Sequence, residues 1–248
     1  MNAIYILWLR EIKRYSRSKA RIVGSLGQPL LFLVALGFGL SSVFQKAGAG
    51  NYFQFLAPGV IAMGILFTAI FAGIQVIWDK EFGFLKETLV APVSRLNIML
   101  GKTLGGATIA IFQGIIVLIL SIFIGFKPSN PVLIPLAFIY MALIAILFTA
   151  LGTAIASVLN DISGFQLIMN FLVQPLFFLS GALFPLNGLP KFLFIITALD
   201  PLSYGVDGLR GTLSSVNHFS LLMDFSVLFI LAVIVISIGG FLFSKIQT

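Results

Sequence analysis

The chain has 248 residues, of which 59% are hydrophobic and only 9% are charged, and its mean hydropathy is +1.12. Because a soluble domain carries about 25% charged residues, this chain cannot cover a water-facing surface. Its composition therefore excludes a soluble enzyme, a nucleic-acid-binding protein and a disordered tail. Apolar stretches of about 20 residues or more recur, which predicts an all-α polytopic membrane protein. These runs are continuous rather than alternating, which excludes a transmembrane barrel.

The net charge of +7 has to be interpreted against a membrane, where the placement of Lys and Arg sets the topology. Cysteine is absent, which excludes disulfides, a thiolate metal site and a cysteine nucleophile. The chain has one histidine, His218, so a metal centre built from several histidines is excluded too. We expect this chain itself to bind no metal and no cofactor.

The first predicted element is an amphipathic helix within residues 1–21. Successive residues are about 100° apart around a helix, which gathers most apolar side chains in an arc of about 140° and the basic ones opposite. The apolar arc holds Ile4, Tyr5, Trp8, Leu9, Ile12 and Tyr15, and the basic arc holds Arg10, Lys13, Arg14 and Arg17, with Ile6 and Leu7 as exceptions. We expect this interfacial helix to lie in the headgroup layer, with its basic residues facing anionic lipid or a partner.

Six apolar segments follow, each with about 20 residues or more, enough to cross about 30 Å of hydrocarbon as a helix. They cover residues 22–44, 55–78, 104–126, 132–159, 162–184 and 221–243. We expect no ionisable side chain within these six transmembrane helices. Because proton- or ion-coupled carriers usually need such a group, the energy for transport is expected to come from outside the chain.

The distribution of Lys and Arg predicts the orientation of the spans. With the N-terminus inside, eleven basic residues fall on the cytoplasmic side and four on the outer side. The inner set is Arg10, Lys13, Arg14, Arg17, Lys19, Arg21, Lys80, Lys86, Arg95, Lys102 and Lys245, and the outer set is Lys46, Lys127, Lys191 and Arg210. Both termini are therefore expected in the cytoplasm. No convincing internal repeat is evident, which favours a single transmembrane domain over residues 1–248.

The longest inner loop, residues 79–102, is predicted to begin with an amphipathic helix that Pro92 ends. Four apolar side chains would share an arc of about 60° on it: Trp78, Phe82, Leu85 and Leu89. The loop also holds three of the eight acidic residues, Asp79, Glu81 and Glu87. Because the positive-inside rule does not require acidic residues, they favour a helix that docks into a groove of a cytosolic protein over a solvated connector.

The triplet Gly101-Lys102-Thr103 looks like the end of a phosphate-binding P-loop. That motif needs a glycine five residues before Gly101, where this chain has Leu96, and a preceding strand, which the pattern does not predict. We therefore expect no ATP hydrolysis by this chain. Two sets of glycines instead predict close contacts between helices: Gly101, Gly105 and Gly106, and Gly37 with Gly39.

The outer segment 185–210 is too apolar for an ordinary loop. Residues 192–199 are apolar but too few to span, and Pro190 and Pro201 bracket them. We expect re-entrant outer helices between spans five and six, which dip into the outer leaflet and return without a seventh crossing. Asp207 and Arg210 stand three residues apart and are predicted to pair on the return leg.

Five amide side chains lie within apolar runs: Gln28, Gln75, Gln113, Asn170 and Gln174. An unpaired buried amide costs a few kcal/mol, so each needs a hydrogen-bond partner. Two interpretations stay open. The more frequent one is hydrogen bonding between helices, and the other is lining of a substrate path.

Two motifs in order resemble those of a known family. The stretch EFGFLKETLVAPVSR at 81–95, followed by Gly101-Lys102, is similar to the coupling-loop signature of ABC-type exporter permeases of the type-2 class. The outer stretches FLSGALFPLNGLP at 178–190 and DPLSYGVDGLR at 200–210 look like that family's second signature. The daunorubicin-resistance-type drug-exporter permeases are most alike, and the resemblance covers essentially the whole chain.

This resemblance implies a homodimer or pseudo-dimer of permeases driven by two separate ATP-binding-cassette subunits, which would bind ATP and Mg²⁺. Carried over by motif, the coupling element holds Glu81, Gly83, Glu87, Pro92 and Arg95. The outer re-entrant element holds Pro185, Pro190, Pro201, Tyr204, Asp207 and Arg210. The coupling loop begins Lys80-Glu81 where the family frequently has Arg-Glu, a change that conserves the charge.

The expected function is ATP-driven export of an amphipathic drug-like or lipid-like compound, as in multidrug resistance, by a multi-pass protein of a prokaryotic cell (inner) membrane. Membrane lipid and the ATPase subunit are its expected partners, and nucleic acid is not. A polysaccharide or glycolipid exporter permease is the alternative within transport, distinguished by polar and aromatic residues along the dimer seam. A non-transporting membrane scaffold or immunity protein is the alternative of another class, and it would need no ATPase partner.

Overall fold

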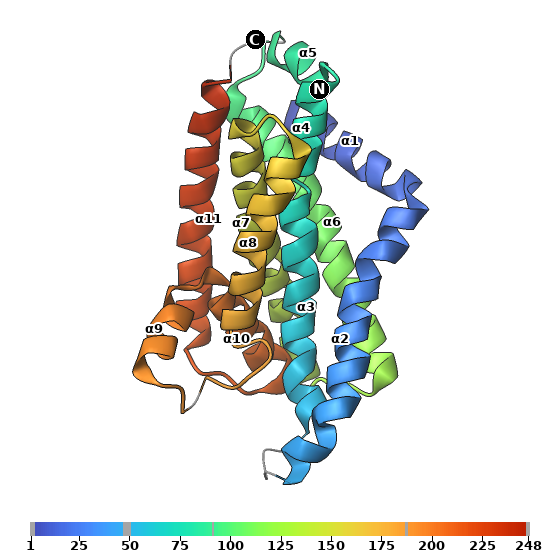
Figure 1. Ribbon diagram of the computed structural model, residues 1–248, viewed down its shortest axis with the longest axis vertical. Helices are drawn as coiled ribbons and strands as arrows, with labels where there is room; N and C mark the ends of the chain where they lie inside the picture. Colours follow the sequence, from blue (N-terminus) through green and yellow to red (C-terminus); the bar gives the residue numbers. More distant parts are fainter. Residues whose placement is uncertain (1–2, 47–50, 91, 187, 247–248) are drawn as a thin grey trace.

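The computed structural model describes residues 3–46, 51–90, 92–186 and 188–246. The predicted interfacial helix, coupling loop and outer segment reach outside these residues at 1–2, 91 and 187. Every regular element in the described ranges is helical, which confirms the all-α fold (Figure 1). In chain order the elements are α1 Ala3–Arg17, α2 Lys19–Lys46, α3 Tyr52–Phe71, α4 Ile74–Glu81, α5 Phe84–Val90, α6 Arg95–Ile124, η1 Pro131–Leu133, α7 Ile134–Val158, α8 Ile162–Leu179, α9 Lys191–Leu199, α10 Pro201–Ser214 and α11 Leu221–Ser244.

Helix α3 lies at the centre of the bundle. It is apolar on all sides, as a buried helix must be, and it packs against α2, α6, α7 and α10, while α11 covers α7 and α10. Helices α1 and α5 lie with the end of α11 at one end of the bundle, which we call the termini end (Figure 1). Helices α9 and α10 lie at the opposite end.

The structure confirms six spans by length and apolar composition within the described chain: Lys19–Ser41, Tyr52–Glu81, Arg95–Ile124, Pro131–Val158, Ile162–Leu179 and Leu221–Ser244. Two of them extend further toward the termini end than predicted. The second continues through α4 to Glu81, and the third begins at Arg95 rather than at 104. The predicted bounds stopped at the first charged residues, but Asp79 and Lys102 lie on the helices because they pair with each other.

The expectation that no span holds an ionisable side chain is wrong at Asp224. This residue lies in the first turn of α11, within the sixth span, and its side chain is fully buried. The positive end of the helix dipole favours a carboxylate there, but neither carboxylate oxygen of Asp224 has a hydrogen-bond partner within the described chain. Mean hydropathy over a long segment does not reveal a single acidic residue at its end.

A close backbone contact joins the junction of α3 and α4 to α7. Gly73 follows α3 and faces Gly152 on α7, and a Cβ on Gly73 would meet the main chain of Gly152. A Cβ on Gly152 would lie 2.9 Å from the Cα of Ile70 and closer still to its carbonyl oxygen. Small residues let the two backbones touch, and this contact fixes where α4 leaves the centre of the bundle.

Candidate functional site

Helix α1 presents three faces rather than the two predicted. Leu7, Glu11 and Tyr15 recur every four residues and are buried against the bundle. Tyr5 is half exposed on the apolar side, and Lys13 is exposed on the basic side. Tyr15 belongs to the predicted apolar arc, whereas Leu7 and Glu11 lie between that arc and the basic one, so a third side of α1 packs against the protein. The pattern predicted the amphipathic helix but not the protein-facing row.

The buried row of α1 packs against α6 at two glycines. A Cβ on Gly101 would lie 2.8 Å from Leu7 Cβ, and one on Gly105 would lie 2.7 Å from Glu11 Cβ. Larger residues at these two positions would push α1 away from α6. The predicted close helix contact at Gly101 and Gly105 is therefore confirmed, and its partner is the N-terminal helix.

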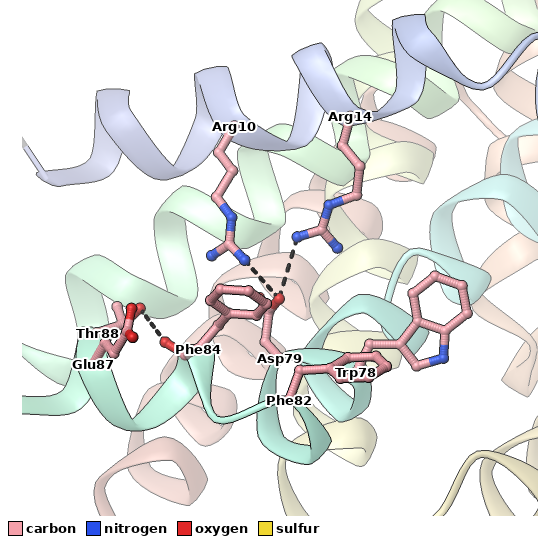
Figure 2. Close-up of a pocket in the computed structure, with 8 residues that line it drawn as sticks. All are labelled: Arg10, Arg14, Trp78, Asp79, Phe82, Phe84, Glu87 and Thr88. Carbon is pink, nitrogen blue, oxygen red and sulfur yellow. Dashed lines mark hydrogen bonds and ion pairs between the residues drawn. The ribbon is translucent and has the colours of Figure 1, made fainter.

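Asp79, in the last turn of α4, is the centre of an ion cluster that joins three helices. Its carboxylate accepts hydrogen bonds from Arg10 Nη2 at 2.8 Å and Arg14 Nη2 at 3.2 Å, both on α1. Lys102 Nζ on α6 lies 2.5 Å from Asp79 Oδ2. Figure 2 shows the two guanidinium groups reaching from α1 toward the same carboxylate oxygen. The cluster thus ties both α1 and α6 to the helix that leads into α5.

Glu11 adds a second carboxylate to the cluster. It lies 3.5 Å from Lys102 Nζ and 3.8 Å from Arg14 Nη2. Lys102 and the two carboxylates are almost fully buried, whereas the side chains of Arg10 and Arg14 are about one-third exposed. A buried charge is tolerated where it is paired. Loss of Asp79 would therefore leave the buried cation of Lys102 poorly compensated.

The single amphipathic helix predicted for the inner loop is broken in two, so that prediction is wrong. Gly83 has a φ of +78°, a left-handed conformation that suits glycine, and it separates α4 from α5. Leu85 and Leu89 are buried, but Phe82, predicted to share their face, is exposed. Hydrophobic periodicity does not reveal a residue with positive φ, so the break could not be read from the pattern.

Two cationic side chains anchor this segment to the bundle. Lys80 Nζ donates to the carbonyl oxygens of Ser157 at 2.5 Å and Leu159 at 2.8 Å, where α7 ends. Free carbonyls and the helix dipole favour a cation at that place. Arg95 Nη1 donates to the carbonyl oxygen of Leu89 at 3.2 Å, at the end of α5. The end of α4 is thus tied to the end of α7, and the end of α5 to the start of α6.

A cavity of about 570 Å³ lies between α1 and the segment from α4 to α5. Its lining side chains are Arg10, Arg14, Trp78, Asp79, Phe82, Phe84, Glu87 and Thr88 (Figure 2). The guanidinium of Arg10 lies 5.4 Å from the centre of the Phe84 ring. Arginine and aromatic side chains are enriched in the anchors of protein interfaces, so this composition suits the docking of another protein.

The residues assigned to the coupling element by motif lie together at the termini end. Gly83 makes the turn and Arg95 the anchor, while Glu81, Glu87 and Pro92 are exposed. Within the described ranges, neither Glu81 nor Glu87 forms an ion pair. Both carboxylates are therefore available to a partner.

At the opposite end, two short helices follow α8, as predicted for the re-entrant element. Helices α9 and α10 meet at an angle of 89° at Asp200, whose carboxylate caps α10 by accepting the N–H of Leu202 at 2.8 Å. Helix α10 is buried along almost its whole length, whereas α9 exposes side chains such as Phe192. With 9 and 14 residues, neither helix alone is long enough to span.

Prolines mark the starts of both outer helices. Pro190 precedes α9 and Pro201 is the first residue of α10, a position where a missing N–H costs nothing. Pro185 is exposed in the turn after α8. Tyr204 closes the corner, since its hydroxyl donates to the carbonyl oxygen of Ala198 at 2.8 Å. Pro190, Pro201 and Tyr204 thus shape the bend between α9 and α10.

The predicted pair of Asp207 and Arg210 is wrong. The Asp207 carboxylate instead accepts two consecutive main-chain N–H groups just before α11, one of them from Phe219 at 2.7 Å. Arg210 Nη2 donates to the carbonyl oxygen of Gly181 at 3.0 Å, and its guanidinium lies 3.9 Å from the centre of the Phe55 ring. The spacing permits a pair, but both side chains bind buried groups elsewhere in the fold instead.

We expect the double exchange Asp207→Arg with Arg210→Asp to be no better than the single reversals. Each reversal should cost about 2 kcal/mol or more, because it leaves buried groups of different partners unsatisfied. The measurement is the thermal unfolding of the single and double variants in detergent. A double variant that recovers half of the loss would show that the two side chains do interact as a pair.

Two of the five amides serve contacts between helices. Gln75, on α4, is buried and accepts a hydrogen bond from Arg14, which adds it to the ion cluster. Gln113, on α6, is buried and accepts from Ser25 Oγ on α2 at 3.0 Å. At these two positions the packing interpretation holds.

The other three amides are exposed on the surface of the bundle. Gln28 lies on α2, and Asn170 and Gln174 lie on α8. The two helices are neighbours, since the rings of Phe32 on α2 and Phe177 on α8 are 5.6 Å apart. These three exposed amides on otherwise apolar surfaces of α2 and α8 therefore remain available to a partner chain or to a substrate path.

Sequence reasoning singled out the segment from Glu81 to Arg95 but missed the ion cluster that anchors it. The triplet that looked like a P-loop is part of this cluster, since Lys102 Nζ contacts Asp79 and Glu11 from within α6. One signal was present in the sequence. Glu11 is an acidic residue in a helix whose other charges are basic, and a buried cation elsewhere is the simplest reason for it.

These features define the protein as an all-α, multi-pass membrane protein, with an amphipathic N-terminal helix and an anchored helical loop at one end and a bent helix pair at the other. Residues 2–214 match the family described as ABC-2 type transporter, and the chain belongs to that family. It is therefore a membrane permease of an ABC transporter.

The chain is also similar to several curated proteins, some of which are named as transport permeases. The putative transport permease ycf38 of Cyanophora paradoxa is 29% identical over 248 aligned residues, which cover 96% of this chain and 82% of the relative. The inner membrane transport permease YadH of Escherichia coli K12 is 28% identical over 234 residues, covering 93% and 90%. Nodulation protein J of Rhizobium leguminosarum bv. viciae is 27% identical over 210 residues, covering 84% and 80%.

Proposed function

We propose that this chain is the membrane-spanning subunit of an ABC exporter and moves an amphipathic drug-like or lipid-like compound out of the cell, with ATP hydrolysed by a separate subunit. The observation that carries this proposal is the anchored segment at the termini end. Phe82, Phe84 and Glu87 are exposed there, while Asp79 is locked to α1 and α6. A displacement of α5 by the ATPase subunit would be transmitted to packed helices rather than lost in a flexible loop.

Purification from native membranes tests the proposal directly. The permease extracted in a mild detergent should bring with it a P-loop ATPase whose activity rises in the presence of transported compounds. Replacement of Phe82 and Phe84 by alanine should release that ATPase, because exposed aromatic residues are typical interface anchors. The matched control is Phe192→Ala, an exposed aromatic at the opposite end. A permease that always purifies without an ATPase would favour the scaffold alternative.

Reversal of a charge on α5 should uncouple the ATPase from the permease. Glu87 lies in the first turn of α5, exposed at the cavity that Arg10 and Arg14 also line. We expect Glu87→Arg to lower substrate-stimulated ATPase activity by about fivefold or more. A basic group of the docked subunit that pairs with the Glu87 carboxylate would then face a second cation. The permease itself should keep its unfolding temperature, since Glu87 takes no part in the buried cluster.

The control for this experiment is Lys127→Glu, a reversal of an exposed charge in the connection between α6 and η1. It should leave the ATPase activity unchanged. Equal activity of Glu87→Arg and wild-type complexes would remove Glu87 from the docking surface.

The proposed orientation places the termini end in the cytoplasm, because eleven of the fifteen basic residues then lie inside. The native chain has no cysteine, so introduced cysteines are clean probes. Cysteines at the exposed positions Ser16 and Ser94 should react only from the cytoplasm, and those at Ser129 and Asn217 only from outside. Labelling of Ser94 from outside would refute this orientation.

The proposal includes a second permease chain seated against α2 and α8. The exposed face of α11 is apolar apart from serines such as Ser226 and Ser237, whose hydroxyls bond within the helix, so it suits lipid. Helices α2 and α8 also expose apolar side chains such as Leu31 and Phe171, but they add three amides, Gln28, Asn170 and Gln174. An amide left unpaired in hydrocarbon costs a few kcal/mol, so this face fits a partner chain and a polar substrate path better than it fits lipid.

A further inference from the structure

A second cavity, distinct from the coupling segment, lies between α2 and α3 next to the turn from α1 into α2. Its volume is about 260 Å³. Its lining combines polar groups from the ends of α1 and α2 with apolar side chains from α3. The residues that matter here are Tyr15, Arg21, Ser25, Met63, Phe67 and Phe71.

Arg21 provides an uncompensated positive charge at this cavity. It is partly buried, and within the described ranges no carboxylate lies at ion-pair distance from it. Its guanidinium lies 5.8 Å from the centre of the Tyr15 ring. The nearest acidic group of the adjoining helix, Glu11, is already paired with Lys102 and Arg14. A partly buried cation without an anion favours the binding of an anionic ligand.

Tyr15 offers a second donor to the same space. The side chain is only 6% exposed, and its hydroxyl is buried without a hydrogen-bond partner. A buried hydroxyl that stays unpaired costs free energy, and a ligand oxygen would satisfy it. By contrast, Ser25 Oγ has two acceptors within reach for its single proton, the carbonyl oxygen of Ile22 and Gln113 Oε1, so it is not free for this purpose. A guanidinium and a phenol beside one cavity are the donors that an oxyanion requires.

The opposite wall of the cavity is apolar and follows one side of α3. Met63, Phe67 and Phe71 recur every four residues, and the rings of Phe67 and Phe71 are stacked with centres 6.4 Å apart. At a rise of 1.5 Å per residue, this row extends about 12 Å along the helix axis. The row leads away from Arg21 toward the middle of the span. It is suited to the first part of an acyl chain rather than to a hydrated ion.

We infer that this cavity binds an anionic phospholipid, with the phosphate at Arg21 and the hydroxyl of Tyr15 and one acyl chain along the apolar row of α3. The position supports a lipid of the leaflet at the termini end, because the cavity begins where α1 joins the first span. The headgroup would complete the charge balance of Arg21, and the chain would fill the crevice between α2 and α3. This inference does not depend on the ATPase partner or on the transported compound.

Lipid retention measured by native mass spectrometry tests the inference. The permease is purified in detergent micelles that contain equal amounts of phosphatidylglycerol and phosphatidylcholine with the same chains. Wild-type protein should retain phosphatidylglycerol in preference. Arg21→Gln should lower that preference about tenfold, the loss expected for one charge-assisted hydrogen bond, and Tyr15→Phe should lower it about threefold.

Matched variants separate a defined site from general attraction. Arg17→Gln removes the same charge from an exposed position of α1 outside this cavity and should keep the preference. Arg21→Lys keeps the charge but not the planar fork, so it should give an intermediate loss even if Arg21→Gln does not fold. Tyr15→Phe removes only the hydroxyl and should fold normally.

Four results would overturn the inference. Wild-type protein could retain both lipids equally, which would show that the cavity holds acyl chains but does not recognise the anionic headgroup. Arg17→Gln could lose as much preference as Arg21→Gln, which would show that anionic lipid is attracted by the basic surface of α1 in general rather than by this cavity. Tyr15→Phe could match the wild type, which would remove the buried donor from the site. Millimolar inorganic phosphate could displace the lipid, which would mark a site for a free anion.

Discussion

Replacement of Asp79 by asparagine is expected to destabilise the permease more than any other single change in the ion cluster. Asp79 is the common partner of Arg10, Arg14 and Lys102, and both Asp79 and Lys102 are almost fully buried. Removing one partner of a buried ion pair costs about 3–5 kcal/mol, which corresponds to a fall of about 10 °C in unfolding temperature. Because the cluster joins α4 to α1 and α6, ATPase coupling should be lost as well.

A second substitution tests whether the loss of stability comes from the pairing of Asp79 with Lys102. Lys102→Met in the Asp79→Asn background removes the buried cation that has lost its main partner, so it should restore about half of the lost stability. The control is Lys13→Gln, which removes an exposed charge from α1 and should change the unfolding temperature little. Thermal unfolding in detergent measures these variants and the single variant Lys102→Met, which completes the cycle. Simple additivity of the two losses would show that Asp79 and Lys102 do not act as a pair.

Replacement of Gly152 by alanine is expected to prevent correct packing of α7 against the centre of the bundle. The added Cβ would lie 2.9 Å from the Cα of Ile70 and closer still to its carbonyl oxygen, and backbone atoms cannot move aside as a side chain can. The cost of such overpacking is about 3 kcal/mol. The yield of monodisperse protein and its unfolding temperature should both fall.

A glycine in open surroundings provides the control. Gly39 on α2 was predicted to mediate a helix contact, but no atom lies within 4 Å of a Cβ built there, so that prediction is wrong. Gly39→Ala should therefore be neutral or stabilising by up to about 1 kcal/mol, because alanine favours the helix. If both alanine variants behave alike, the close contact at Gly152 does not limit folding.

The sequence by itself determined the membrane class, the all-α fold, the six spans and the helical segments at both ends. Each follows from local physics. An apolar run of sufficient length must span as a helix, as α7 does, and the octet at 192–199 is too short to do so. Glu81 and Glu87 lie at one end of the bundle, as their place in the chain between two spans requires.

Only the tertiary structure decided which charges meet. Asp79 and Lys102 are 23 residues apart, and Asp79 and Arg10 are 69 apart, so no local periodicity links them. The same limit explains why Asp207 and Arg210, three residues apart, bind other groups than each other. Local spacing gives the contacts that a helix allows. The burial of a charge and the partner that compensates it depend on which helices pack together, and in this protein glycine contacts such as those at Gly101 and Gly152 set that packing.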